Sequence, residues 1–341
     1  MKNTYNTAMG SVWQLLKTKS EKTGAAFTVL APMEDVTDTV FRQMVMFQGR
    51  PDLFMTEFTN CDGLASRGRA RIIHRLEYTE NQHPIVAQIW GRKVETYLQA
   101  IPLISAMGFD GVDINMGCPV PKVVKSGAGA GLIREPSIAR AILDSVKEEI
   151  AKSENNSLSL SVKTRIGYDD IDLSWIEMLL KSPIDALTIH LRTKKEMSAV
   201  PVHWELMKNI IELRDSINPN IVIVGNGDIT TKEQIATYKK IYGVDGLMIG
   251  RGIFEDIGLF NKDNGSNSAT PLERIGLVRQ HINLFLETWG TRKNFEMIKK
   301  YFKIYLKDFD GAAVLRNKLL RVKTPDEMLR IIEKYEENGQ S

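Results

Sequence analysis

The feature of this sequence that most constrains its fold is a short apolar run that recurs eight times, each time bounded by turn residues. Segments with helical periodicity fill most of the intervals, and such alternation is typical of a parallel sheet covered by helices. Eight repeats favour an α/β fold of the (β/α)8 TIM barrel type over an open, doubly wound sheet. The expected strands are Phe27–Ala31, Leu53–Thr56, Ile85–Ile89, Gly111–Ile114, Leu158–Lys163, Ala186–Ile189, Ile221–Val224 and Gly246–Ile249.

Six helices are expected between the strands, and glycines mark where two of them end. Gly108 and Gly243 follow helical segments, and glycine readily adopts the left-handed backbone conformation that ends a helix. No GxGxxG fingerprint for dinucleotides opens a strand–helix unit. The expected helices are Asp38–Phe47, Val94–Met107, Ser137–Ala151, Leu173–Lys181, Trp204–Asp215 and Lys232–Tyr242.

The chain of 341 residues is long enough for one large domain and a smaller second one. We expect the barrel over residues 25–260, a polar linker over 261–270, and a small all-helical C-terminal domain over 271–341. Residues 1–24 are expected to form a flexible lead-in with one short helix around Val12–Lys17.

Composition favours an intracellular globular protein, with 43% hydrophobic and 26% charged residues. No apolar run reaches the roughly 18 residues that a membrane helix needs, and the first residues lack the layout of a secretion signal. The two cysteines, Cys61 and Cys118, form neither a disulfide framework nor a CxxC pair. We therefore expect a cytoplasmic protein with no membrane partner and no metal, in which any reactive cysteine acts alone.

Polar or glycine-rich groups follow nearly every expected strand, at the end where barrel enzymes place their chemistry. One polar residue after a strand is commonly a turn or a helix cap, but their concentration on one rim indicates an active site. These groups are Pro32-Met33, Glu57, Gln88, Asn115-Met116-Gly117-Cys118-Pro119, Lys163-Thr164-Arg165, His190-Leu191-Arg192, Asn226-Gly227-Asp228 and Gly250-Arg251.

Two glycine loops, Gly225–Asp228 and Gly250–Gly252, follow the seventh and eighth strands. Loops at these places commonly bind a phosphate, which predicts a phosphate-bearing cofactor, and the alternative is two plain glycine turns. Lys163 and Arg165 point to the same face if the fifth strand continues through them. A cation there either stabilises a negatively charged cofactor ring or pairs with an acid on a neighbouring strand.

The two cysteines differ in their sequence surroundings. Cys61 is best interpreted as inert packing, whereas Cys118 lies in a loop between a glycine and a proline. A thiol with a pKa of about 8.5 is mostly protonated at neutral pH and can donate a proton to a carbanion. No histidine lies close to Cys118 in the sequence to activate a thiolate nucleophile. Cys118 is therefore a candidate proton donor.

These segments together resemble the flavin-dependent tRNA-dihydrouridine synthases, in the same order and spacing over most of the chain. The Asn-x-Gly-Cys-Pro run is specific to that family, whereas the glycine loops alone are not. The matching motifs are Ala31–Asp38, Gln88, Asn115–Pro119, Lys163–Gly167, His190–Thr193, Gly225–Asp228 and Gly250–Gly252.

The resemblance implies that FMN lies across the barrel mouth and that NADPH reduces it. Hydride then passes from flavin N5 to C6 of a uracil in tRNA, while Cys118 protonates C5, and the base must leave its stack to react. Residues implied to bind the cofactor are Pro32, Met33, Glu34, Gln88, Lys163, His190, Asn226, Gly227, Asp228, Gly250 and Arg251. Residues implied to hold the uracil and its charge are Asn115, Arg165 and Arg192, with His190 as a further candidate.

The helical domain is implied to form a tRNA-binding surface, and its charge agrees with that role. Residues 291–325 hold ten basic side chains against three acidic ones, although the whole chain has a net charge of only +3. The alternative is a solvated lysine-rich face over an aromatic core, which we favour only for the interleaved aromatic residues. The candidate phosphate-binding residues are Arg292, Lys299, Lys300, Lys303, Lys307, Arg316 and Lys318.

The sequence departs from the family's pattern at two places that bear on how the substrate is positioned. Asp35 stands where many relatives carry glycine, and the segment Met197–Trp204 lacks the usual Tyr-x-Gly-x-Ala-Asp-Trp pattern apart from Trp204. The sequence therefore does not predict which uridine is reduced.

Other functions remain open on the sequence alone. An FMN barrel that reduces a small pyrimidine or enoate would share the phosphate loops but would not need a basic helical tail. A tRNA-binding protein without activity would be expected to have lost Cys118 or Lys163, and both are present. We expect a monomer.

Overall fold

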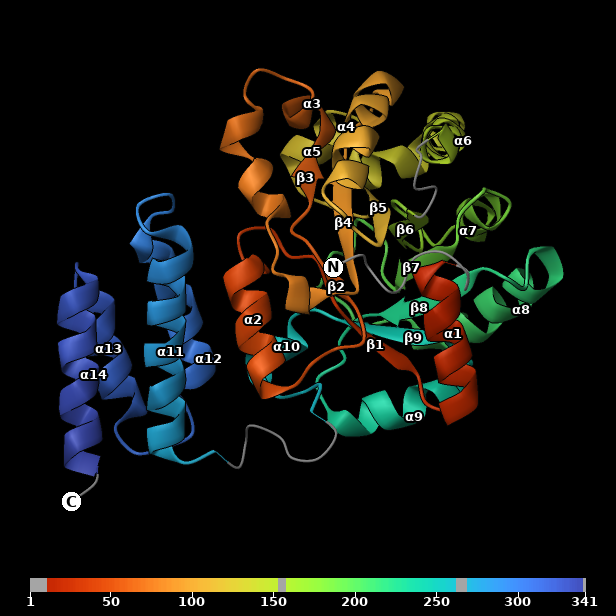
Figure 1. The fold of residues 1–341 in the computed structure, drawn as a ribbon. Coiled ribbons are helices and arrows are strands. Elements are labelled where there is room, and N and C mark those ends of the chain that lie inside the picture. Colours follow the sequence, from red (N-terminus) through yellow and green to blue (C-terminus); the bar gives the residue numbers. More distant parts are fainter. Residues whose placement is uncertain (1–10, 153–157, 262–268, 340–341) are drawn as a thin grey trace. The chain divides into compact units, whose positions relative to one another are not determined.

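The computed structural model of the chain describes residues 11–152, 158–261 and 269–339 (Figure 1). Their contacts divide the chain into two compact units. The first unit contains the residues up to 39 together with residues 51–250, and the second contains residues 40–50 and those from 251 onward. Most of the expected linker over 261–270 falls outside the described residues, and the domain boundaries drawn from the sequence stay predictions.

Eight parallel strands of the first unit confirm the predicted barrel. They are β1 Phe27–Leu30, β2 Phe54–Met55, β4 Ile85–Trp90, β5 Gly111–Met116, β6 Ser159–Arg165, β7 Ala186–His190, β8 Val222–Asn226 and β9 Gly246–Ile249. Their order in the sheet is β1-β9-β8-β7-β6-β5-β4-β2, and a bridge between Val29 and Leu53 joins β1 to the chain entering β2. A short extra strand, β3 Thr59–Asn60, pairs with β4.

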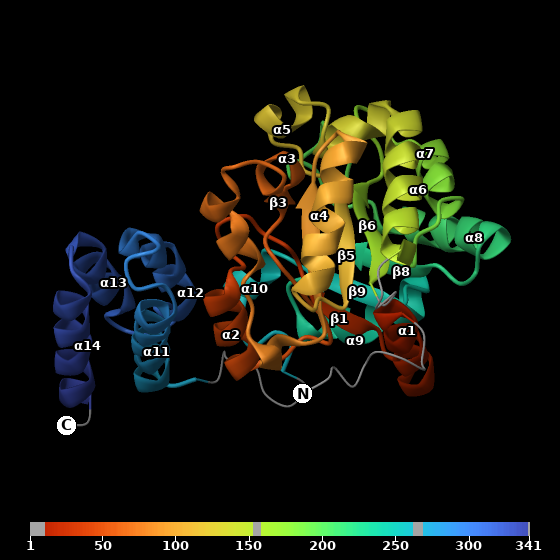
Figure 2. The ribbon, with the colours of Figure 1, turned by 45° about the horizontal axis from the view of Figure 1, so that its top comes forward.

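The expected helices are present and alternate with the strands. Their limits are α2 Thr39–Gln48, α4 Val94–Ala106, α6 Pro136–Lys152, α7 Leu173–Leu180, α8 Met207–Ile217 and α9 Lys232–Tyr242. Figure 2 shows α4, α6 and α7 on the outer side of the strands. Gly243 ends α9 in the left-handed conformation with φ +78°, as predicted. The expected start of α8 at Trp204 is wrong, because Trp204–Leu206 form a separate 3-10 turn, η5. Among the described residues, no helix is both long and apolar enough to span a membrane.

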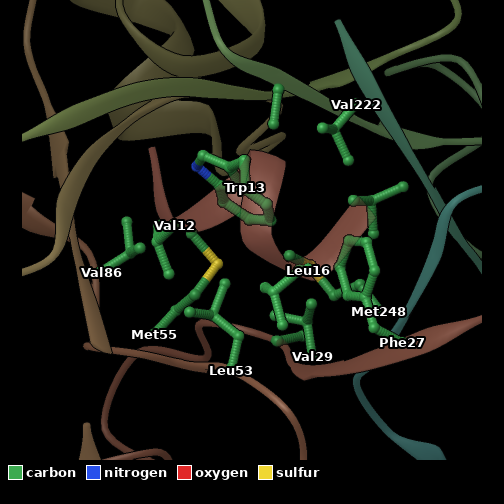
Figure 3. Packing of buried hydrophobic residues seen from close by; sticks show 13 residues of the cluster. Val12, Trp13, Leu16, Phe27, Val29, Leu53, Met55, Val86, Val222 and Met248 are labelled. Carbon is green, nitrogen blue, oxygen red and sulfur yellow. The ribbon is translucent and has the colours of Figure 1, made fainter. Parts of the chain in front are cut away.

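The N-terminal segment closes one end of the barrel, and the expectation of a flexible lead-in is wrong for residues 11–23. Helix α1 covers Val12–Thr23, and Ser11 caps its first turn. Trp13 is completely buried among side chains from the surrounding strands (Figure 3). The helix also donates hydrogen bonds to carbonyls that precede the strands, from Gln14 to Asn220 and from Ser20 to Asp245. Helix α1 therefore covers the amino-terminal ends of the strands, opposite the rim that carries the predicted site.

Short helices in the strand connections were not predicted from the sequence. They are α3 Cys61–Leu64, η1 Arg69–Arg71, η2 Ile73–Leu76, η3 Glu80–Gln82, α5 Pro121–Lys125 and η4 Gly129–Arg134. Each has six residues or fewer, which is too short to show a helical period.

The described part of the second unit is helical, as expected from the sequence. Besides α2, it contains α10 Gly252–Glu255, α11 Pro271–Trp289, η7 Phe295–Tyr301, α12 Phe302–Tyr305, α13 Ala312–Arg321 and α14 Pro325–Gly339. Tyr301 stacks on Phe41 with their ring centroids 4.9 Å apart, and the Tyr305 hydroxyl lies 2.8 Å from Nδ1 of His281. The interleaved aromatic residues therefore form core, which is the interpretation that the sequence favoured for them.

Candidate active site

The carboxyl ends of β5 to β8 bring predicted site residues side by side. In the parallel register Asn115 pairs with Lys163, and His190 pairs with both Arg165 and Asn226. These ends form the face of the barrel that carries the chemistry in this fold. Candidate residues from four consecutive strands therefore share one rim.

Asn115 holds the loop that carries Cys118. Its Oδ1 atom accepts hydrogen bonds from the backbone N–H groups of Gly117 and Cys118, at 3.1 and 2.9 Å. The carbonyl of Cys118 accepts another hydrogen bond from the N–H group of Ala130, at 3.0 Å. Because both backbone polar groups of Cys118 are bonded, the position of its thiol is determined by the fold of this loop. The uracil contact predicted for Asn115 stays a prediction beside this structural role.

The environment of Cys118 favours the protonated thiol. Cys118 is 8% exposed, and burial raises the pKa of its thiol above the usual value. A hydrogen bond from the backbone of Val120 and the charges of Arg165 and Lys163 act in the opposite direction without reversing the shift. The residue can thus donate a proton at neutral pH. Cys61 is completely buried in the core, which agrees with inert packing.

A chain of buried hydrogen bonds runs from Asn115 into the barrel interior. Asn115 Nδ2 donates to Gln88 Oε1 at 3.0 Å, and Gln88 Nε2 donates to Asp113 Oδ2 at 2.7 Å. Ser161 Oγ donates to the other oxygen of Asp113, also at 2.7 Å. Burial raises the pKa of Asp113 to about 6, although these hydrogen bonds and the nearby Lys163 oppose the shift. Gln88, predicted to bond a cofactor ring, therefore also ties β4 to β5.

Lys163 is a cation on the rim, and the acidic side chain whose charge acts on it is the buried Asp113 of β5. Among the described residues, its ammonium forms no hydrogen bond or ion pair. Burial, followed by the charge of Arg165, lowers the pKa of Lys163 to about 8. A partly buried ammonium without a partner is unfavourable unless an anion binds beside it. This favours the cofactor role over the salt bridge that the sequence left open.

The two arginines predicted to hold the uracil are bonded to rim loops. Arg165 donates to the carbonyls of Gly117 and Thr193, both at 2.9 Å. Arg192 forms a bidentate ion pair with Asp228. Both arginines are buried. They hold the loops after β5, β7 and β8 in place, and their contact with uracil stays a prediction.

The loops after β8 and β9 have backbone suited to a phosphate-bearing group. Gly227 has a φ of +138°, and a Cβ atom there would lie 2.7 Å from Val202, so this position requires glycine. Asp228 follows with a φ of +45°, which few residues other than glycine adopt. A Cβ atom on Gly250 would lie 3.6 Å from Ala31, next to the first rim loop. Together with the ammonium of Lys163, these loops fit a cofactor with a phosphate and an anionic ring.

Asn226 and Arg251 have different relations to this site. Asn226 lies on the same rim, where its Nδ2 atom donates to the carbonyl of Met248 at 2.8 Å. Arg251 is exposed and belongs to the second unit.

Sequence reasoning missed Arg75, which organises the loop after β1. Arg75 lies in η2, and its guanidinium binds Glu34 at 2.5 Å and Asp35 at 3.2 Å. The N–H group of Asp35 donates to the buried carboxylate of Glu57 at 2.6 Å. Asp35 has a φ of +57°, a backbone conformation that favours glycine. Pro32 is buried and Met33 is half-buried beside this loop.

The segment that departs from the family's pattern is held by its own ion pair. Glu196 accepts a hydrogen bond from the N–H group of Thr193 at 2.7 Å and lies 2.9 Å from Nε2 of His203. The hydrogen bond with Glu196 raises the pKa of His203. Against the effect of burial, the hydrogen bonds from the Thr193 backbone and from His203 lower the pKa of Glu196. Trp204 donates from its indole nitrogen to the carbonyl of Gly227 at 3.1 Å, which ties this segment to the loop after β8.

The predicted phosphate-binding residues of the second unit fall into two groups. Lys299 is 10% exposed and donates to the carbonyls of Leu320 and Val322, at 3.0 and 2.7 Å. Lys307 and Arg316 also donate to backbone carbonyls of this unit. The remaining candidates are exposed, and they are Arg292, Lys300, Lys303 and Lys318. Arg292 also donates to a backbone carbonyl, that of Thr288 at 2.8 Å. Hydrogen bonds within the unit thus engage four of the seven candidates, which the sequence did not distinguish.

The described residues were searched for side chains that could bind a metal ion. Among them, no group of three or more His, Cys, Asp or Glu side chains is arranged to hold an ion. The functional groups described above on the rim are a thiol, an ammonium and backbone donors.

The chain is similar to known proteins over most of its length. The model of the dihydrouridine synthase (Dus) family matches residues 29–339. The chain is 42% identical over 314 residues to "Probable tRNA-dihydrouridine synthase 2" of Bacillus subtilis (strain 168), covering 91% of this chain and 94% of that protein. It is 41% identical over 314 residues to a "Probable tRNA-dihydrouridine synthase" of Staphylococcus aureus (strain Mu50), covering 91% and 93% respectively.

A solved structure of histamine dehydrogenase from Rhizobium sp. 4-9 shares the fold. The match has a TM-score of 0.52 at 13% sequence identity. It covers 75% of this chain and 48% of that chain, so this chain spans about half the length of the larger protein. On the family match and the relatives above, this chain belongs to the dihydrouridine synthase family, whose members are flavin-dependent.

Proposed function

We propose that this chain reduces the C5–C6 double bond of specific uridines in tRNA, with FMN as cofactor and NADPH as reductant. The observation that carries the proposal is a buried, protonated cysteine on the exit loop of β5, near an ammonium that has no ion pair. A proton donor and a cation at one rim fit the addition of hydrogen to a polarised double bond. Relatives named as tRNA-dihydrouridine synthases support the choice of substrate.

In this proposal the chain's own residues position the base and supply the proton. When bound, the flavin would supply the hydride that adds at C6 of the uracil. The Cys118 thiol donates its proton to C5, where negative charge develops. Lys163 stabilises the negative charge of the cofactor ring, and Asn115 keeps the Cys118 backbone in place.

We assign the cofactor contacts as the sequence predicts them. Pro32, Met33 and Glu34 line the ring, while Gln88 and Lys163 bond to it. Backbone N–H groups near Gly227 and Gly250, helped by Arg251, hold the phosphate. The glycine required at Gly227 supports this assignment, because a side chain there would collide with Val202.

The tRNA is proposed to present its target uridine unstacked at the barrel rim. The exposed basic residues of the second unit, Arg292, Lys300, Lys303 and Lys318, neutralise backbone phosphates. We further propose that the protein works as a monomer in the cytoplasm.

The substitution Cys118→Ala tests the role of the thiol. We expect the variant to keep its yellow flavin and its affinity for tRNA but to lose at least about a hundredfold in dihydrouridine formation, because the proton donor is gone. Mass spectrometry of dihydrouridine in tRNA measures the product, and the visible spectrum measures bound flavin.

Cys61→Ala is the matched control, since Cys61 is completely buried and has no role in the proposed chemistry. It should retain activity. Dihydrouridine formation at the wild-type rate by Cys118→Ala would contradict the proton-donor assignment.

A further inference from the structure

A recess in the first unit lies among the loops on the rim. It is a pocket of about 360 Å³, formed by residues that follow β4, β5, β6 and β7. Its charged and aromatic lining consists of Arg92, Lys125, Arg134, Glu135, Tyr168 and Lys194. None of these residues belongs to the cofactor or uracil contacts assigned above.

The pocket concentrates positive charge. Four cationic side chains and one carboxylate line it, so its formal charge is +3. Arg92 pairs with Glu135 at 2.9 Å. Within the described residues, Lys125, Arg134 and Lys194 form no ion pair. Like charges gathered without counterions repel one another, and a bound anion would relieve that repulsion.

The cations are held in place before any ligand binds. The guanidinium of Arg134 lies 4.1 Å from the centre of the Tyr168 ring, and the ammonium of Lys194 lies 4.9 Å from it. A Cβ atom at Gly127 would lie only 2.0 Å from a guanidinium nitrogen of Arg92. Glycine at this position therefore allows Arg92 to lie against the backbone at the wall of the pocket.

The pocket shares a structural element with the proposed proton donor. Val123 of α5 packs in the cluster that contains Cys118, and its neighbour Val124 lines the pocket. The N–H group of Lys194 donates to the carbonyl of Gly167 at 3.0 Å, which joins the loops after β6 and β7 beside the pocket. The pocket is thus built on the same rim loops that surround the reacting base.

We propose that this pocket binds a backbone phosphate of the RNA strand, next to the uridine that enters the barrel mouth. The inference rests on the proposed function. A nucleotide turned out of its stack keeps a phosphate on each side, so a cationic recess beside the mouth can anchor the strand there.

A phosphate of a nicotinamide dinucleotide fits the pocket less well. Among the described residues that line the pocket, Tyr168 is the one aromatic side chain, and its ring already contacts Arg134 and Lys194 rather than being left free to stack on an adenine. The pocket therefore provides cations for a phosphate without a place for the attached base.

The double variant Lys125→Ala/Lys194→Ala tests the site through tRNA affinity at several salt concentrations. A lysine that neutralises a phosphate contributes roughly 0.7–0.9 to the slope of log K against log salt. Loss of two should lower the slope by about 1.5 and weaken binding roughly twentyfold near 0.15 M salt. Lys208→Ala, an exposed lysine of α8 outside the pocket, is the matched control and should bind as the wild type does.

Unchanged affinity and salt slope in the double variant would overturn the inference. So would a raised KM for NADPH with unchanged tRNA binding, which would assign the pocket to the dinucleotide. These results are separate from failure of the proposed function, which would appear as absence of dihydrouridine formation by the wild-type protein itself.

Discussion

Asp113 and Lys163 place opposite charges on neighbouring strands inside the barrel. Asp113 is completely buried, and burial raises its pKa to about 6. An acid whose pKa is higher in the folded protein than in the unfolded chain binds more protons when folded. Its effect on stability is therefore neutral at low pH and becomes unfavourable as the pH rises from about 4 through about 6.

The substitution Asp113→Asn should remove this pH dependence. The shift from 3.8 to about 6 corresponds to on the order of 3 kcal/mol between the two protonation states. Relative to wild type, the variant should therefore gain stability between pH 4 and pH 7 by up to that amount, whatever constant loss its altered hydrogen bonds to Ser161 and Gln88 cause. Urea unfolding at a series of pH values measures the change.

Asp52→Asn provides a control with the opposite sign. Hydrogen bonds and the charge of Lys19 lower the pKa of Asp52 despite its burial, so its stabilisation is present above the usual aspartate pKa and is lost as the pH falls. Parallel pH profiles for wild type and Asp113→Asn would contradict the assignment of a raised pKa to Asp113.

At the scale of elements, α1 covers one end of the barrel, a role that its sequence does not predict. Trp13 enters the interior of the barrel from the amino-terminal ends of the strands, where it is surrounded by apolar side chains (Figure 3). Its indole nitrogen has no hydrogen-bond acceptor among the described residues. The contribution of Trp13 to stability therefore comes from packing.

Trp13→Ala should destabilise the protein by about 3–5 kcal/mol, because it leaves a large cavity in the core. Trp13→Phe should cost less, since it retains an aromatic ring and removes a buried N–H group that lacks an acceptor. Lys22→Ala, at an exposed position of the same helix, should change stability by less than about 0.5 kcal/mol. Urea unfolding compares the three variants, and equal losses for Trp13→Ala and Lys22→Ala would show that α1 does not close the barrel.

At the scale of the whole molecule, the net charge does not show where the cations proposed to bind RNA are gathered. The chain carries a formal charge of only +3, yet cations gather in the second unit and in the rim pocket of the first. Within the second unit, the lysines fall into two groups, those bonded within the fold and those exposed on its surface. Lys299 is bonded to carbonyl oxygens, whereas Lys300 and Lys303 are exposed.

Substitution of these lysines should separate a role in stability from the proposed role in tRNA binding. The double variant Lys300→Ala/Lys303→Ala should keep its stability and lower the salt slope of tRNA binding by about 1.5. Lys299→Ala should instead lower stability by about 1–3 kcal/mol, because the carbonyls of Leu320 and Val322 lose their donor. Thermal unfolding and tRNA binding, measured on both variants, test the division. Equal effects of the two variants on the salt slope would contradict it.

The sequence alone predicted the barrel, its eight strands and most of its helices. Apolar runs and helical periods are local patterns that show which face of an element is buried. It also placed Cys118, Lys163 and Asn226 on one rim, because parallel strands end on the same side. Elements of six residues or fewer, such as η2 with Arg75, could not be predicted in this way, because they are too short to show a helical period.

Only the tertiary structure decided which partner each polar or buried group has. The sequence marks Arg165 and Arg192 as cations near the site, but their carbonyl and carboxylate partners come from other loops. It likewise marks Trp13 as apolar without showing that the barrel interior receives it. The physical reason is that periodicity records burial along one element, whereas hydrogen bonds, ion pairs and core packing join residues that are distant in the chain.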